Sequence, residues 1–329
     1  MNPMKKSIML WQADHCREQT VADWGDTLAL GDIDCIRVKS HDGLSLMGAF
    51  YSHPLAPVSL DEIQRQYEEF GAGGIVYVPW CNPLGRDVPA EAQLAIDVAR
   101  RCGNRLDVDI EVGPEFWDVH NPAIGNKRIP EYFQRIADAG IEIVVDTAMF
   151  DGWVEALRLV EIAPLVKRLL SQSYDIGFKT DYRRLFDHDV AEMRRTGVRE
   201  LGIVLDARAG KGIAERAAYA QSLGCTEVSC WAADMATPDT YHGFLMVPSE
   251  PFLDDVMPTP PPVPNDDLWT AMAHKSQSVR DSAVTLAELA TPGDTRFTEQ
   301  QSLDEAWRIT EMWQTAALEI RDLALRLKG

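Results

Sequence analysis

The chain has 329 residues, of which 46% are hydrophobic and 25% are charged, and its formal net charge at pH 7 is −19. This balance is ordinary for a protein that folds in water and excludes a disordered or membrane-embedded chain. The surplus of negative charge, without a stripe of lysine and arginine to offset it, excludes nucleic acid as the expected partner.

The N-terminal segment and the six cysteines indicate where the protein is made. Only four apolar residues follow Lys5, Lys6 and Ser7 before polar residues return, which is too short for a signal peptide or a membrane span. The cysteines show neither CxxC spacing nor a cluster with histidine, so we expect reduced thiols, with no zinc site and no disulfide framework. We expect a protein that is cytoplasmic as synthesised, with release on lysis or incorporation into a virion as the alternatives.

Eight short β-rich segments alternate with longer amphipathic segments in the first 245 residues. The predicted strands cover 8–12, 35–40, 74–80, 106–112, 141–146, 166–174, 201–206 and 227–232, and the predicted helices cover 20–30, 60–70, 89–102, 129–139, 153–162, 182–196 and 211–222. Several of these helices are followed by a glycine, which suits the left-handed backbone after a helix C-terminus. The alternation predicts an α/β fold, a (β/α)8 TIM barrel.

Charged and aliphatic residues alternate within several predicted strands. Arg37 and Lys39 alternate with aliphatic residues in the second strand, and Asp107, Asp109 and Glu111 do so in the fourth. Successive residues of a strand face opposite sides, so we expect the aliphatic set to face the helices and the charged set to point into the barrel. There, the bases of strand two can pair with the acids of strand four and reduce the cost of burial.

The C-terminal part of the chain has a different character. Seven prolines lie between Pro248 and Pro264, and two helical segments follow at about 267–290 and 302–327. We expect three parts: a TIM-barrel domain over 1–245, a proline-rich linker over 246–266 and a C-terminal helical hairpin over 267–329. The last helix carries a wide apolar face, which predicts either packing on this chain or use in oligomerisation or docking on an assembly partner.

The candidate chemistry lies at the end of the fourth strand, because active sites of such barrels form at the C-terminal ends of the strands. Asp109 and Glu111 are two residues apart and project to the same side, with Cα atoms roughly 6.6 Å apart. Two such carboxyl groups can act as a proton donor and its partner, as glycoside hydrolysis requires. We take Glu111 as the general acid and Asp109 as its partner; a divalent-cation site or a structural ion pair uses the same residue types.

The order of short motifs along the barrel resembles the glycoside hydrolase family 25 lysozymes and their phage and bacterial relatives. The matching segments are VKSHDG, VYVPW, LDVDIE, SQSYD and VSCWAAD, and the resemblance covers about residues 8–235. It implies a glycan-cleaving barrel in which Asp109 and Glu111 are catalytic and no metal or organic cofactor is needed. An acid near the end of strand one also contributes in that family, which implies Asp14 here.

Further side chains at the expected mouth are candidates for substrate binding. Tyr77, Trp80, Tyr174 and Trp231 offer aromatic faces to sugar rings or simply fill volume, Gln172 offers hydrogen bonds to substrate or within the protein, and Lys39 and Asp234 complete the set. An acid after a strand, such as Asp206 or Asp234, is also a common helix cap. His41 is expected to be a structural loop histidine.

The leading hypothesis is a glycosidase that cleaves a polysaccharide such as peptidoglycan by carboxylate acid/base catalysis. The alternative is a catalytically inactive barrel with a structural or carbohydrate-binding role in a larger assembly such as a phage virion.

Overall fold

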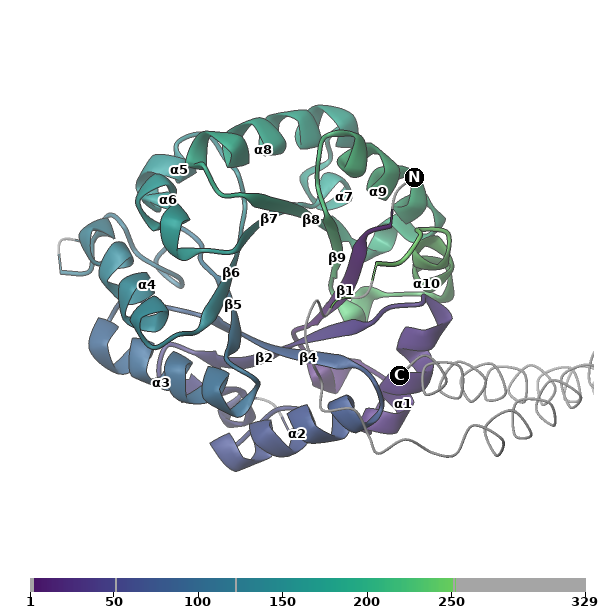
Figure 1. The fold of residues 1–329 in the computed structure, drawn as a ribbon, viewed down its shortest axis with the longest axis horizontal. Helices are drawn as coiled ribbons and strands as arrows, with labels where there is room; N and C mark the ends of the chain where they lie inside the picture. Colours follow the sequence, from purple (N-terminus) through teal and green to yellow (C-terminus); the bar gives the residue numbers. More distant parts are fainter. Residues whose placement is uncertain (1–2, 51, 122, 251, 253–329) are drawn as a thin grey trace, which may run out of the picture. The chain divides into compact units, whose positions relative to one another are not determined.

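The computed structural model describes residues 3–50, 52–121, 123–250 and 252. These residues form a closed barrel of eight parallel strands with helices outside it, so the predicted TIM barrel is confirmed (Figure 1). The predicted hairpin at 267–329 and nearly all of the predicted linker lie outside the described residues. Within the described part, no helix is long and apolar enough to cross a membrane.

The barrel closes because its first strand pairs with both the second and the last. The strands are β1 (Lys5–Leu10), β2 (Cys35–Asp42), β4 (Val76–Asn82), β5 (Arg105–Asp109), β6 (Glu142–Thr147), β7 (Arg168–Ser173), β8 (Glu200–Asp206) and β9 (Glu227–Trp231). A short strand, β3 (Ser45–Leu46), pairs antiparallel with the end of β2. The registers Ile8 with Ile36 and Lys6 with Val228 complete the ring.

Helices cover the outer face of the ring. They are α1 (Val21–Leu30), α2 (Leu60–Ala72), α3 (Val88–Arg101), α4 (Ile129–Asp138), α5 (Trp153–Ala156), α6 (Leu159–Ile162), α7 (Asp175–Phe178), α8 (Tyr182–Thr196), α9 (Ile213–Ser222) and α10 (Pro238–Leu245). Short 3-10 turns join them: η1 (Ala13–His15), η2 (Met47–Ala49), η3 (Asn126–Arg128), η4 (Ala163–Leu165), η5 (Ala207–Gly212) and η6 (Ala233–Met235). The outward aliphatic residues of the strands pack against these helices in one large apolar cluster.

The glycine signals after the predicted helices are confirmed. Gly74, Gly103, Gly140, Gly197 and Gly224 all have positive φ. Four described residues other than glycine also have positive φ, namely Asp32, Asn104, Arg158 and Lys179. Arg158, with φ of 52°, divides the predicted helix at 153–162 into α5 and α6. The predicted lengths are therefore right for most helices and wrong for this one.

The first strand lies further toward the N-terminus than predicted. It begins at Lys5 instead of residue 8, because Lys6 is buried and its Nζ finds acceptors in Gly31, Asp32 and Val247, at 3.1, 3.0 and 3.2 Å. Because these hydrogen bonds compensate for the burial of its charge, Lys6 can be part of the strand and need not be a polar residue before it. The shift brings Trp11 to the mouth of the barrel, just beyond the last residue of β1.

Candidate active site at the barrel mouth

Two acids of the β5 segment share one amide donor. Asp109 ends β5 and is buried, whereas Glu111 lies two residues further on and is partly exposed. Gln172, on β7, donates from Nε2 to Asp109 Oδ1 at 2.9 Å and to Glu111 Oε1 at 3.2 Å. The backbone stays extended through this region because Ile110 N donates to Asp146 O at 3.0 Å. The structure therefore brings together the two predicted catalytic acids and the predicted glutamine.

The environment of these acids favours their protonated forms. Burial, followed by the nearby carboxylates of Glu111 and Asp146, raises the pKa of Asp109 well above its usual value. Burial also raises the pKa of Glu111, although the hydrogen bond from Gln172 and the charge of Lys39 lower it in part. A partly exposed acid with a raised pKa, next to a buried acid that keeps its proton, is suited to proton donation.

A third acid, Asp146, faces the same space, and the sequence did not single it out. It ends the inward-facing set of β6, in register with Asp109, and it is fully buried with neither carboxyl oxygen hydrogen-bonded. Burial, followed by the charge of Asp107, raises the pKa of Asp146 well above its usual value. Alternation along β6 put this residue inside the barrel, but nothing in the sequence distinguished it from a structural acid.

Lys39 is the positive charge that acts on the acid pair. Its Nζ forms an ion pair with Asp42 at 2.9 Å and lies 4.9 Å from the centre of the Trp80 ring. The neighbouring His41 is buried with Nδ1 2.8 Å from the hydroxyl of Ser40. Burial lowers the pKa of His41 to about 3, so the neutral form is favoured at ordinary pH; the residue lies within β2 and not in a loop as predicted.

Aromatic rings form a cluster at the C-terminal ends of β1, β4, β7 and β9. Trp231 stacks on Trp11 with centroids 5.5 Å apart and meets Trp80 edge-on at 5.6 Å. Tyr174, directly after β7, stacks on Trp231 at 6.3 Å, and its buried hydroxyl has no hydrogen-bond partner. Two of the four predicted aromatics, Tyr174 and Trp231, are therefore partly exposed at the mouth, together with Trp11, which was not predicted. Trp80 is fully buried in an apolar cluster inside the barrel and donates from Nε1 to Leu10 O at 3.2 Å, so it fills volume there.

The prediction that the fourth aromatic residue, Tyr77, lies at the mouth is wrong. Its hydroxyl donates to Gln66 Oε1 of α2 at 3.2 Å, and its ring packs on Phe70. Tyr77 thus faces the outer helices, since it has the opposite parity to Val78 and Trp80, which face inward. It belongs to the core and not to the mouth.

Two further predicted acids lie away from the pair. Asp14 is exposed on η1, and Asp234 is partly buried on η6, with one oxygen that has no hydrogen-bond partner. These turns follow β1 and β9, which lie across the barrel from β5. Asp206 caps η5 by accepting from Arg208 N at 3.0 Å, as the alternative interpretation of strand-end acids predicted.

Deeper in the barrel, a second set of charges is paired. Arg37 contacts Asp107 at 3.1 Å and Glu227 at 2.6 Å, and Glu227 also pairs with Arg168. Ser7 Oγ donates to Glu227 at 3.0 Å. The predicted pairing of strand-two bases with strand-four acids is confirmed for Arg37 and Asp107, and these groups are not shared with Asp109 or Glu111.

Among the described residues, no group of three or more His, Cys, Asp and Glu side chains is arranged to hold a metal ion. All six cysteines are free, and five of them are buried.

No protein-family model and no curated protein matches the sequence. Solved structures match by fold. The spore cortex-lytic enzyme SleL of Bacillus cereus has 8% identity and a TM-score of 0.53, with 75% of each chain covered. SleL of Bacillus megaterium QM B1551 has 8% identity and a TM-score of 0.51, covering 75% of this chain and 74% of that one. A glycoside hydrolase family 18 N-acetylglucosaminidase from Paenibacillus barengoltzii has 11% identity and a TM-score of 0.50, covering 73% and 99%.

At these identities the likeness establishes the barrel fold that the chain has in common with the three enzymes. The resemblance to family 25 lysozymes, which rests on short motifs, stays a prediction.

Proposed function

We propose that the protein is a glycoside hydrolase that cleaves a polysaccharide containing N-acetylated sugars, such as peptidoglycan, with Glu111 as the general acid. The observation that carries this proposal is the pair of carboxyl groups that share the amide of Gln172 at the mouth of the barrel. The fold is the one that the cortex-lytic enzymes and the N-acetylglucosaminidase have. The proposal extends to this chain the glycan chemistry named for those proteins.

Glu111 donates its proton to the glycosidic oxygen as the bond to the anomeric carbon breaks. A water molecule then adds to that carbon and gives a proton back to the Glu111 carboxylate. The raised pKa of Glu111 keeps a fraction of the residue protonated, and its partial exposure lets a substrate reach it. Asp109 orients the substrate by hydrogen bonding, because burial raises its pKa and so favours the protonated form, which offers a donor. Lys39 and Gln172 then limit how far the pKa of Glu111 rises.

The test is a screen of the purified protein against bacterial cell walls, peptidoglycan and other common glycans, with release of reducing ends as the readout. Glu111→Gln keeps the shape of the side chain but cannot supply the proton, so we expect turnover to fall about 10²- to 10⁴-fold. Glu115→Gln, the same change at an exposed acid of the following loop, is the matched control and should stay within about twofold of the parent.

Unchanged turnover in Glu111→Gln would remove this residue from the mechanism. Cleavage of none of the glycans by the parent protein would reject the hydrolase and favour the non-catalytic barrel.

A further inference from the structure

A row of aromatic rings continues from the candidate site onto the rim of the barrel. Tyr174 stacks on Trp231 and also packs on Phe178, with centroids 5.7 Å apart. Phe178 in turn meets Phe150 at 5.2 Å, and Phe150 meets Trp153 at 5.0 Å. We call Tyr174, Phe178, Phe150 and Trp153 the rim aromatic surface. It connects the loop after β7 with the loop after β6.

The outer part of this surface is open to solvent. Phe178 is 39% exposed and Phe150 is 42% exposed, and Ile176, between Tyr174 and Phe178, is 36% exposed. Phe150 is packed by its neighbours largely edge-to-face, at 60° to Phe178 and 89° to Trp153. A packing role alone would be better served by burying these side chains, because exposed apolar rings gain little from the core.

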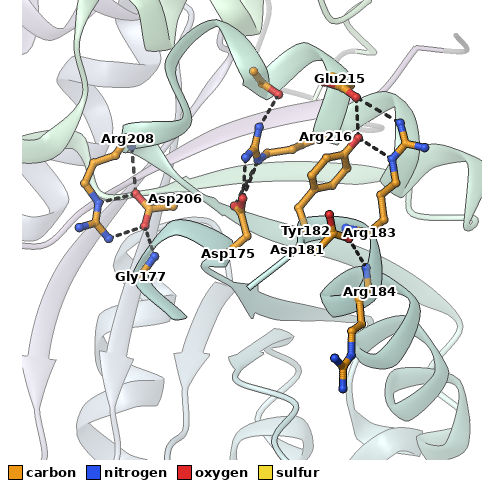
Figure 2. A network of polar contacts seen from close by, with 11 residues as sticks. Asp175, Gly177, Asp181, Tyr182, Arg183, Arg184, Asp206, Arg208, Glu215 and Arg216 are labelled. Atoms are coloured by element: carbon orange, nitrogen blue, oxygen red, sulfur yellow. Dashed lines mark hydrogen bonds and ion pairs between the residues drawn. The ribbon is translucent and has the colours of Figure 1, made fainter. Parts of the chain in front are cut away.

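The loop that carries Phe178 is fixed in place by polar contacts (Figure 2). Arg216 of α9 holds Asp175, the first residue of α7, with its Nη2 2.5 Å from Oδ2. Gly177 N donates to Asp206 Oδ2 at 3.2 Å, and Asp206 also pairs with Arg208. A Cβ at position 177 would lie only 3.2 Å from the Arg208 guanidinium. The helix is therefore held at both of its sides, and the ring of Phe178 is presented in a preset position.

The chemistry of the surface fits a sugar polymer. The faces of pyranose rings carry C–H groups that pack on aromatic rings, and their hydroxyl groups stay in water, so a half-exposed aromatic row is a suitable platform. The ring-to-ring steps lead from Tyr174, two residues after the Gln172 that contacts both acids, to the loop after β6. When a glycosidic bond of a polysaccharide lies at Glu111, the neighbouring sugars of that polysaccharide would contact the rim aromatic surface.

We propose that the rim aromatic surface binds the part of a polysaccharide that extends beyond the cleaved bond, so that the protein prefers long glycan strands to short fragments. This inference rests on the proposed function and adds to it the direction in which the substrate leaves the site. Rigid presentation of the rings lowers the ordering cost of binding.

The experiment compares glycan strands released from peptidoglycan by an amidase and separated by length, with long strands and tetrasaccharides assayed side by side. In the parent protein, kcat/KM should be higher for the long strands. In Phe150→Ala/Phe178→Ala, the ratio of long-strand to tetrasaccharide kcat/KM should fall about tenfold, since two aromatic contacts are lost. Phe150→Leu/Phe178→Leu keeps apolar volume but no aromatic face, and the ratio should fall nearly as far.

Leu245→Ala is the control, because it removes an exposed apolar side chain (53% exposed) at the end of α10, and it should leave the ratio unchanged. An unchanged ratio in both double variants, or a parent protein with no preference for long strands, would overturn the inference while the hydrolase stands. A parent protein that cleaves neither length would overturn both.

Discussion

The inside of this barrel holds two groups of charges that differ in their balance. At the base, Arg37 pairs with Asp107 and Glu227, and Arg168 pairs with Glu227 and Glu200, so that every acid has an arginine as its partner. At the mouth, Asp109 and Glu111 lie in the field of one lysine, Lys39, which is itself paired with Asp42, and neither carboxyl oxygen of the nearby Asp146 has a hydrogen-bond partner.

The pKa values follow this balance. Arg37 and Arg168 hold the pKa of Glu227 below its usual value although burial favours the neutral form, whereas burial raises the pKa of all three mouth acids. Asp107 is intermediate, because burial raises its pKa to about 6 in spite of the charge of Arg37. The ionised form is thus favoured for Glu227, which has two arginines as partners, and the protonated form is favoured for the acids that have less opposite charge beside them. The base is suited to holding the fold and the mouth to handling protons.

The largest expected effect comes from breaking the balance at the base. Arg37→Met leaves Asp107 and Glu227 buried without their main counter-ion, so we expect unfolding free energy to fall by about 3–5 kcal/mol. Denaturant unfolding followed by circular dichroism measures it. Arg65→Met removes an arginine that is half exposed and pairs with Glu62 and Glu69, and should cost under about 1 kcal/mol. Equal losses in the two variants would contradict the role given to the base.

A second effect concerns the amide that joins the two mouth acids. Gln172→Leu removes donors to Asp109 and Glu111, and we expect kcat to fall about 2- to 10-fold, since a hydrogen bond to a protonated carboxyl group is worth about 0.5–1.5 kcal/mol. The hydrogen bond lowers the pKa of Glu111, so its loss raises that pKa. Because the protonated acid is the active form, the alkaline limb of the kcat profile should move to higher pH. A lower kcat with an unmoved limb would reduce Gln172 to a packing role.

A third effect is a gain in stability at the mouth. Asp146 has a pKa in the folded state well above that of the unfolded chain, so the native state binds more protons and stability falls as pH rises between the two values. Asp146→Asn is neutral at every pH and avoids this loss. We expect it to be more stable than the parent at pH 7, by on the order of 1 kcal/mol or more, and the gain to shrink toward pH 4. Thermal unfolding across that range measures it, and a gain independent of pH would contradict the explanation.

The smallest expected effect tests whether Tyr77 lies on the outer face of the barrel strands and not on the inner face. Tyr77→Phe removes the hydroxyl that donates to Gln66, so unfolding free energy should fall by about 1 kcal/mol. Turnover should stay at the parental level, because Tyr77 faces α2. Parental stability together with reduced turnover in Tyr77→Phe would contradict the placement of this residue in the outer core.

The sequence was sufficient for the barrel because its signals are local. Alternation within strands and glycines after helices each depend on a few neighbouring residues, and they also predicted the pair Arg37 and Asp107. The errors have physical causes. Tyr77 and Trp80 are three residues apart and cannot face the same side of one strand, and the lysines that begin β1 resembled a polar flank until the structure supplied their buried acceptors.

The candidate site was only partly predictable. The spacing of Asp109 and Glu111 is a property of one strand, whereas the contacts with Gln172, Asp146 and Trp11 join strands that are far apart in the sequence. Alternation tells which side a residue faces, but not which residue of another strand it meets. That the carboxyl group of Asp146 is buried without a hydrogen-bond partner could be recognised only in the structure.

The pairing that closes the ring also has a consequence for how the chain is made. Ser7 of β1 bonds to Glu227 of β9 across 220 residues, and Lys6 contacts the carbonyl of Val247. On the ribosome, β1 can join β2 early, but its other edge stays uncovered until nearly the whole barrel has been synthesised. A fragment that stops before β9 would expose two open sheet edges, which are sites for self-association. The last strand therefore determines whether the newly made protein is soluble.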